Sequence, residues 1–211
     1  MTIATEESKM TEESGSEILV RRILLDGEAV TDEIINFSAF LNHHLDVRLL
    51  EGIGKEFRRR FDDIADKVNM ILTVEASGIA IATLAATFFD YVPVLIAKKD
   101  LPDSIRGGYY FTDISSLRDR TLTAIKVEKK YLGEGDRCLL IDDVCARGED
   151  ILGLWHLARE AGAEVLGAGV AIEKEFQGGG KKLRDRGIRV ESLAVVTKIE
   201  DGHIHVRRQG Q

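Results

Sequence analysis

The sequence predicts an α/β domain in which a mostly parallel central sheet is flanked by helices. Two runs that are rich in apolar residues, 70–74 and 138–142, have the length and composition of strands buried on both faces. Each run is followed by a short turn of small or acidic residues and then by a helical pattern. Repeated strand–turn–helix units are typical of parallel sheets, in which ligands bind at the carboxyl ends of the strands.

The composition fits one globular domain. The chain has 211 residues, of which 44% are hydrophobic and 31% are charged. The formal net charge of -7 argues against a broad basic surface for nucleic acid. No apolar run approaches the roughly 20 residues of a membrane-spanning helix, so we expect no membrane partner. Cys138 and Cys145 have neither CxxC nor disulfide-framework spacing, which indicates a reducing compartment, and we expect a cytoplasmic location.

The first third of the chain precedes the regular alternation. Residues 1–17 hold five glutamates among small polar residues, which predicts a disordered acidic tail before a domain at 18–211. Residues 17–46 mix a helix, a DG turn and short apolar segments. Residues 47–61 are predicted to be helical, because apolar residues recur at helical spacing at Leu49, Ile53, Phe57 and Phe61.

The remaining elements follow in alternating order. Residues 100–120 are polar and contain glycine, which predicts a long loop of the kind that is usually functional or mobile and that could close over a substrate. A DG pair predicts a hairpin turn within 199–206. Further strands are expected at 93–99, 122–128, 165–174 and 189–196, and helices at 79–89 and 149–162.

The strongest functional signal is the segment CLLIDDVCARGED at 138–150. A buried strand carries Asp142 and Asp143 to its carboxyl end, and a tight turn at 146–148 then opens a helix. The unpaired amides of a helix N-terminus can bind a phosphate, and adjacent carboxylates can accept hydrogen bonds from sugar hydroxyls or hold the waters of a magnesium ion. Two other interpretations remain open: an acidic pocket like that of response regulators, or helix capping by Glu149 and Asp150.

Two further groups of residues follow strands of the same predicted sheet. The small residues Ala76, Ser77 and Gly78 follow strand 70–74, and their unhindered amides would suit an anion such as diphosphate. Lys98 and Lys99 end the strand at 93–99 and could pair with the same anion, although a solvated strand end would look the same. Because parallel strands end at one edge, we expect both groups to lie near the two aspartates.

The segment 138–150 resembles the diphosphate-sugar signature of type I phosphoribosyltransferases. Together with AFLNHHLD at 39–46, VEASGIA at 74–80 and the segment 172–193, it makes residues 18–206 similar to bacterial xanthine phosphoribosyltransferases. The resemblance implies the type I phosphoribosyltransferase fold, with a small hood built from about 18–46 and the C-terminal segments. It also implies an enzyme that transfers phosphoribosyl from 5-phosphoribosyl-1-diphosphate to an oxopurine, most readily xanthine, and that works with magnesium as a homodimer.

The resemblance also assigns roles to residues. Asp142 and Asp143 would be catalytic. Magnesium would arrive with the substrate, without a direct protein ligand, and these two carboxylates would contact it only through water. Ala76, Ser77, Gly78, Lys98 and Lys99 would hold the diphosphate. The loop made of Ala146, Arg147, Gly148, Glu149 and Asp150 would hold the 5-phosphate. The base would be contacted by Ile35, Asn42 and Lys174.

The chain departs from the family pattern at two places. The 5-phosphate loop ends with Glu149 and Asp150, where family loops commonly carry Thr, Ser or Gly. Residues 115–119 read SSLRD, where the family has an aromatic–Ser–aromatic–Thr–Lys run. These departures keep two alternatives open: a phosphoribosyltransferase-fold binding or regulatory protein without turnover, and a transferase for adenine, guanine or orotate.

Overall fold

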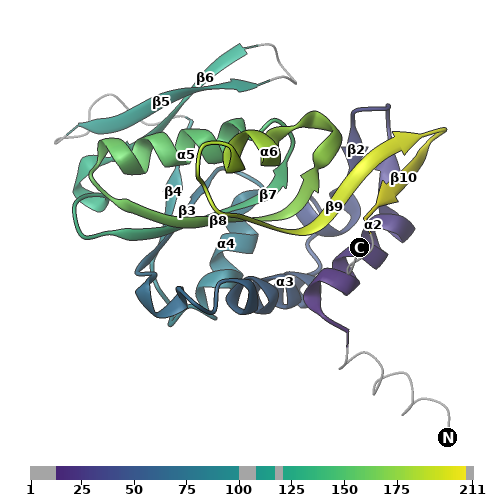
Figure 1. Cartoon of the computed structure of the whole chain (residues 1–211), viewed down its shortest axis with the longest axis horizontal. Coiled ribbons are helices and arrows are strands. Elements are labelled where there is room, and N and C mark those ends of the chain that lie inside the picture. The colour runs from purple at the N-terminus through teal and green to yellow at the C-terminus, as the bar shows by residue number, and fades with distance from the viewer. Residues whose placement is uncertain (1–12, 100–107, 117–120, 208–211) are drawn as a thin grey trace, which may run out of the picture.

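The computed structural model describes residues 13–99, 108–116 and 121–207 and contains a six-stranded sheet. The strand order is β10-β9-β8-β7-β3-β4, in which all neighbours are parallel except the edge pair β9–β10 (Figure 1). This confirms the predicted mostly parallel sheet. The strands are β3 (Met70–Val74), β4 (Val94–Ala97), β7 (Arg137–Cys145), β8 (Glu164–Lys174), β9 (Val190–Glu200) and β10 (His203–Val206).

Helices cover both faces of this sheet. One face carries α3 (Val47–Arg60) and α4 (Gly78–Ala86), and the other carries α5 (Glu149–Glu160) and α6 (Gly179–Arg184) (Figure 1). The helical pattern predicted at 47–61 is confirmed, because its apolar residues Leu49, Ile53, Phe57 and Phe61 are all buried against the sheet. Each face therefore has its own apolar core. No helix among the described residues is long and apolar enough to cross a membrane.

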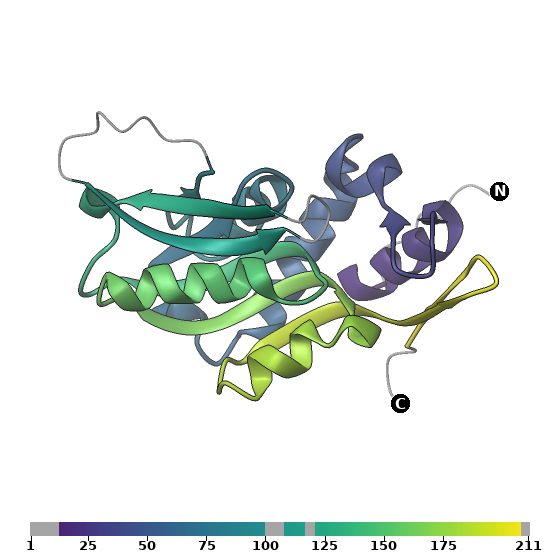
Figure 2. The same ribbon diagram turned by 90° about the horizontal axis from the view of Figure 1, so that it is seen from above.

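A two-stranded hairpin contacts α5 on the side away from the sheet (Figure 1), and its strands run alongside the helix when seen from above (Figure 2). It consists of β5 (Tyr109–Ser116) and β6 (Thr121–Glu128), which pair in antiparallel register. The loop predicted over 100–120 is therefore wrong for its second half. Residues 109–114 alternate between sides, with Ile114 buried against α5 and Phe111 exposed, and this period of two favours a strand. The rest of that loop, 100–107 and 117–120, lies outside the described residues.

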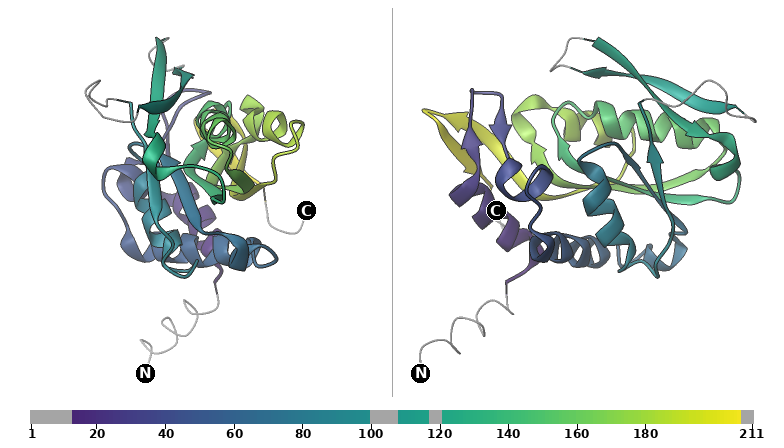
Figure 3. Two further views of the ribbon diagram at one scale, coloured as in Figure 1. Left: turned by 90° about the vertical axis from the view of Figure 1, so that its left-hand side faces the viewer. Right: turned by 180° about the vertical axis from the view of Figure 1, so that it is seen from behind.

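The N-terminal segments gather at one end of the sheet, beside β9 and β10 (Figure 3). They comprise α2 (Gly15–Asp26), β1 (Glu28–Ala29), β2 (Ile35–Asn36) and a π-helical turn (Ser38–Asn42). We call this group, with the β9–β10 hairpin, the hood. The hairpin turns at Asp201 and Gly202, whose φ angles of 50° and 75° suit the predicted DG turn.

The boundary predicted for the acidic tail is wrong by three residues. Helix α2 begins at Gly15, because Ser14 and Glu17 form a capping box. The Ser14 hydroxyl accepts a hydrogen bond from the Glu17 amide at 3.2 Å, and the Glu17 carboxylate accepts one from the Ser14 amide at 2.7 Å. Residues 1–12, which hold the rest of the predicted tail, lie outside the described residues.

Replacement of Phe57 by alanine is expected to lower the free energy of unfolding by about 3–5 kcal/mol, as for other fully buried phenylalanines. The Phe57 ring is fully buried between α3 and the sheet, and a methyl group on Gly169 of β8 would sit only 2.8 Å from its Cε1. Urea denaturation measures the loss. Leu25→Ala is the control, because Leu25 is 70% exposed and should change the free energy by less than about 0.5 kcal/mol. Equal losses in both variants would contradict this packing.

Candidate active site

The carboxyl ends of four neighbouring parallel strands bring the predicted site residues to one edge of the sheet. Strand β7 supplies Asp142 and Asp143, and it continues past them to Cys145 instead of ending at Asp142 as predicted. The extension forms because β8 pairs with it to the end, Cys145 opposite Glu173. The turn after β3, the end of β4, the loop after β7 and the last residue of β8 contribute most of the other candidates, and Ile35 and Asn42 come from the N-terminal segments.

The two aspartates form a buried acidic pair. Asp142 is 3% exposed and Asp143 is 7% exposed. The amide of Asp143 donates a hydrogen bond to Oδ1 of Asp142 at 2.9 Å. Burial, and then the neighbouring charges of Asp143 and Asp150, raise the pKa of Asp142 well above its usual value. A nearby cation, or hydroxyl groups that donate hydrogen bonds to the carboxylate, would stabilise the ionised form of such a buried group.

The turn after β3 packs directly against this pair. A methyl group on Gly78 would lie 2.4 Å from the Thr73 hydroxyl and 3.2 Å from Oδ1 of Asp142, so only glycine fits there. The buried Thr73 hydroxyl has no hydrogen-bond partner among the described residues. The side chain of Ser77, at the N-cap of α4, accepts no hydrogen bond from the first amides of that helix, although the Ile79 amide donates to the main-chain oxygen of Ala76 at 3.3 Å.

A contact between main chain and side chain ties this turn to the end of β4. The Glu75 carboxylate accepts a hydrogen bond from the amide of Lys99 at 2.5 Å. The peptide bond between Glu75 and Ala76 is cis. Lys98 pairs through its main chain with Lys126 of β6, at 2.9 and 2.8 Å. The end of β4 at Lys99 is therefore adjacent to the start of the turn that holds Ala76–Gly78, because β3 and β4 are neighbours in the sheet.

The loop behind the acidic pair leads into α5. Gly148 is its N-cap, with a left-handed φ of 76° that favours glycine. No described side chain caps α5, so its first amides are free of a capping partner. Ala146 is half-buried and Arg147 is exposed. The loop thus leads from the two carboxylates to a helix N-terminus without a side-chain cap, a backbone arrangement that can accept an anion.

The two carboxylates at the end of the loop have different partners. Glu149 accepts a hydrogen bond from Nζ of Lys182 on α6 at 2.6 Å, so its charge is paired with that ammonium group. Asp150 is different. Burial raises its pKa, the charge of Lys99 opposes that rise, and Asp143 adds to it. The charge of Asp150 is therefore influenced both by the acidic pair and by Lys99.

The predicted base-binding residues lie around the hood. Lys174, the last residue of β8, is 8% exposed and donates from Nζ to the main-chain oxygen of Glu33 at 3.1 Å. Ile35 is buried in β2, two residues after Glu33. Asn42 is exposed at the end of the π-helical turn. Gln177, which sequence reasoning missed, donates to the same Glu33 oxygen at 3.0 Å.

The charge of Lys174 is set by its surroundings. Burial lowers the pKa of its ammonium group, while the negative charges of Glu33 and Asp143 oppose that shift. The influence of Asp143 on Lys174 means that the hood side of the site and the acidic pair share one electrostatic environment. A ligand that spans the two would therefore meet a buried ammonium group at one end and a buried carboxylate pair at the other.

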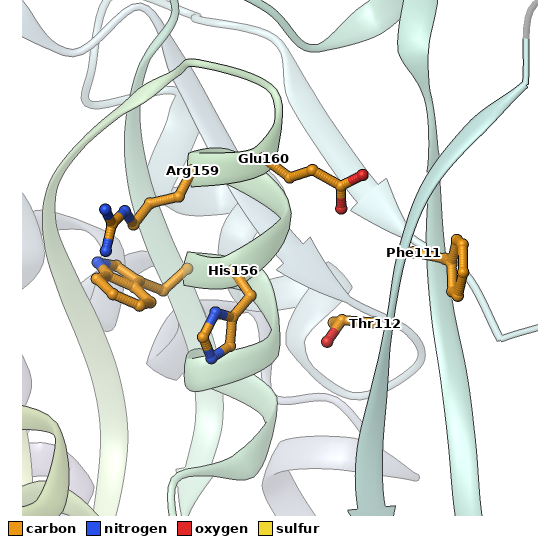
Figure 4. A pocket seen from close by; sticks show the side chains of 6 residues that line it. Phe111, Thr112, His156, Arg159 and Glu160 are labelled. Carbon is orange, nitrogen blue, oxygen red and sulfur yellow. The ribbon is translucent and has the colours of Figure 1, made fainter.

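Two other features of the described residues do not belong to this site. Burial raises the pKa of the Cys138 and Cys145 thiols to about 12, which does not suit a nucleophile. A hollow of about 500 Å³ opens between β5 and the far end of α5, away from the acidic pair, and contains none of the predicted site residues (Figure 4). It is lined by Phe111, Thr112, Trp155, His156, Arg159 and Glu160.

No direct metal cage is present in the part of the chain that the structure describes. There, no group of three or more His, Cys, Asp or Glu side chains is placed to hold a metal ion. Magnesium usually keeps several waters and takes only one or two carboxylates with substrate phosphates. The pair Asp142 and Asp143 fits that second kind of contact.

Comparison with known proteins places this geometry in a family, although no family model matches the chain. Xanthine phosphoribosyltransferase 1 of Clostridium perfringens is 43% identical over 191 residues, which cover 90% of this chain and 100% of that protein. Xanthine phosphoribosyltransferase of Bacillus cytotoxicus is 42% identical over 187 residues, 89% of this chain and 93% of that protein.

Solved structures agree on the fold. The adenine phosphoribosyltransferase of Giardia lamblia, solved with 9-deazaadenine, superposes with a TM-score of 0.70 at 21% identity and covers 87% of this chain and 98% of that one. The adenine phosphoribosyltransferase of Rhodothermus marinus gives a TM-score of 0.67 at 18% identity, over 86% and 98%. The chain has the type I phosphoribosyltransferase fold and belongs to the xanthine phosphoribosyltransferase family.

Proposed function

We propose that this protein transfers the phosphoribosyl group of 5-phosphoribosyl-1-diphosphate to an oxopurine, xanthine above all. A ring nitrogen of the base forms a bond to C1 of the sugar as the bond from C1 to the diphosphate oxygen breaks. The products are the nucleoside monophosphate and diphosphate. The observation that carries the proposal is the position of the buried pair Asp142 and Asp143 beside the uncapped N-terminus of α5, at the edge where parallel strands end.

In this proposal each part of the substrate has its own partners. Asp142 and Asp143 accept hydrogen bonds from the ribose hydroxyls and favour the positive charge that develops on the sugar as diphosphate leaves. The amides of 146–150 hold the 5-phosphate, and Arg147 offsets its charge. The amides of Ala76, Ser77 and Gly78, with Lys98 and Lys99, hold the diphosphate.

Magnesium is the proposed cofactor. When bound with the substrate it would neutralise the diphosphate charge, and Asp142 and Asp143 would hold its waters. This role suits carboxylates that lie in a buried, negative environment. Lys98 and Lys99 supply the remaining positive charge on the diphosphate side.

The base is proposed to lie beneath the hood. The buried ammonium group of Lys174 and the amide of Asn42 would satisfy the carbonyl oxygens and a ring nitrogen of an oxopurine, with Ile35 as the apolar neighbour. Gln177 shares a main-chain partner with Lys174 and would fix its position. An adenine amino group would pair poorly with an ammonium group, because both are donors.

The proposal extends to the setting of the enzyme. Resemblance to the family supports a homodimer. Both cysteines are free and buried, which fits the reducing environment of the cytoplasm. The proposed ligands are small molecules, and the formal net charge of -7 does not favour nucleic acid.

A binding protein without turnover remains the second candidate, and one observation favours it. Asp150 is a carboxylate in the first turn of α5, close to where the 5-phosphate would dock. The experiment that separates the two candidates supplies magnesium, 5-phosphoribosyl-1-diphosphate and a panel of purine and pyrimidine bases, and follows diphosphate release. Release with xanthine supports the transferase, whereas binding of the sugar without product for every base supports the second candidate.

Replacement of Asp142 and Asp143 together by asparagine is expected to reduce nucleotide formation by at least about 100-fold, the usual scale for loss of a group that stabilises transition-state charge. The melting temperature near pH 7 should stay the same or rise. The pKa of Asp142 is raised in the folded protein, so its ionised form destabilises the fold once the pH exceeds the pKa of the unfolded chain. A neutral isostere removes that penalty, and the gain should disappear near pH 3, where both states are protonated.

The control is Asp185→Asn, because Asp185 is 61% exposed and pairs only with Lys181 among the described side chains. It should leave both turnover and melting temperature unchanged. A folded double variant that still makes nucleotide at close to the wild-type rate would rule out the proposed role of the acidic pair.

Lys174→Ala is expected to raise the KM for xanthine about 10- to 100-fold, the usual scale for loss of a hydrogen bond from a charged group. The KM for 5-phosphoribosyl-1-diphosphate should change far less. Steady-state kinetics with each substrate varied in turn measures both constants. Lys181→Ala, whose side chain is 79% exposed, is the control. If Lys174→Ala leaves the relative kcat/KM values for the different bases unchanged, the result would favour adenine as the acceptor.

A further inference from the structure

The proposed 5-phosphate loop lies against α6. The amide of Gly179, the first residue of that helix, donates to the main-chain oxygen of Ala146 at 3.1 Å. A methyl group on Gly179 would lie 2.5 Å from both that oxygen and the amide nitrogen of Gly148. The loop side is equally close, because a methyl group on Gly148 would lie 3.2 Å from the side chain of Leu183 on α6. The backbone of the loop is therefore packed on α6 without room for a side chain between them.

A buried carboxylate holds α6 in place. Glu173 is 3% exposed and lies at the end of β8, immediately before Lys174. Arg184, the last residue of α6, donates to it from both terminal nitrogens, at 3.0 and 2.8 Å. The Ser192 hydroxyl on β9 donates to the same carboxylate. A methyl group on Gly180 would lie 1.9 Å from the Glu173 oxygen, so α6 sits directly on this carboxylate.

The charge of Glu173 is maintained by these partners. Burial on its own would raise the pKa of Glu173, but the hydrogen bonds from Arg184 and Ser192 outweigh it and hold the pKa below its usual value. The carboxylate is therefore ionised at neutral pH and can bind Arg184 through two charge-assisted hydrogen bonds. Alternation along β8 directs Glu173 toward α6 and the next residue, Lys174, toward the hood.

We propose that Glu173 and Arg184 are positioning residues for the 5-phosphate loop. They fix α6 on the sheet, and α6 fixes the backbone of 146–148 through Gly179. The same helix presents Lys182, whose Nζ donates to the Glu149 carboxylate at the end of the loop at 2.6 Å. This inference rests on the proposed function, because it takes residues 146–150 as the site of the 5-phosphate.

The effect should be confined to one part of the substrate. Backbone amides bind a phosphate well only when they are held within about 0.5 Å of the productive geometry. The principal contacts of α6 are with β8, β9 and the turn at 175–177, whereas the proposed diphosphate site is built from the ends of β3 and β4. Loosening α6 should therefore weaken binding of the 5-phosphate and leave binding of diphosphate almost unchanged.

The test titrates ribose 5-phosphate and inorganic diphosphate, each with magnesium, into the full-length protein and its variants by calorimetry. Arg184→Ala should raise the Kd for ribose 5-phosphate about tenfold, which is the lower end of the usual effect of removing a supporting residue. The Kd for diphosphate should change by less than about twofold. In kinetics, the KM for 5-phosphoribosyl-1-diphosphate should rise about tenfold and the KM for xanthine should not. Lys181→Ala is the matched control on the same helix and should change neither ligand.

Loss of a buried partner can prevent folding, so Ser192→Ala is the second variant. It removes one of the hydrogen bonds to Glu173 and leaves the ion pair, and it should show the same selective loss at about threefold. The inference is overturned if a variant loses affinity for both ligands equally, or if neither variant loses affinity for either ligand. In both cases the proposed function still stands as long as the wild-type protein makes nucleotide. A wild-type protein that forms no nucleotide and binds no ribose 5-phosphate would overturn the proposed function itself, and this inference with it.

Discussion

The site depends on two carboxylates that are held, nearly out of solvent, where β7 passes the end of its partner β3. Strand β3 pairs with β7 only as far as Leu140, while β8 follows β7 to Cys145. The backbone past Leu140 is therefore open on one side, where the turn beginning at Glu75 and the start of α4 approach Asp142. A buried carboxylate pair is unfavourable on its own, so a fold that keeps it needs either nearby cations or a ligand that supplies them.

The cations near the site are distributed so that each carboxylate has a different environment. Lys99 acts on Asp150, Lys174 is influenced by Asp143, and Lys182 binds Glu149 directly. Asp142, the most buried of the four, is left with its pKa raised. Among these four carboxylates, only Glu149 has a direct hydrogen bond from a described lysine, and burial leaves the pKa of both Asp142 and Asp150 raised. This arrangement favours a ligand that brings hydroxyl donors and a metal ion to the same point.

Much of this could be predicted from the sequence. The strand at 70–74 and the helix at 47–61 followed from their apolar patterns, because in these segments the core decides the conformation, and the mostly parallel sheet followed from the alternation of strands with helices. The strand at 109–116 was missed, since its polar alternate residues look like a loop until the hairpin partner β6 and the face of α5 are known. The helix start at Gly15 was also missed, although Ser14 and Glu17 have the spacing of a capping box. The loop at 146–148 was recognised from its sequence motif. Its contacts with α6 join residues about 33 positions apart, and such contacts cannot be predicted from the periodicity of apolar residues.

The most direct test of the account is a crystal structure of the protein with 5-phosphoribosyl-1-diphosphate and magnesium. The account predicts that the ribose hydroxyls lie within hydrogen-bond distance of Asp142 and Asp143, with the 5-phosphate on the amides of 146–150 and Glu149 still bound to Lys182. A complex in which the sugar lies elsewhere, or in which the side chains of Glu149 and Asp150 occupy the loop and exclude the phosphate, would contradict it.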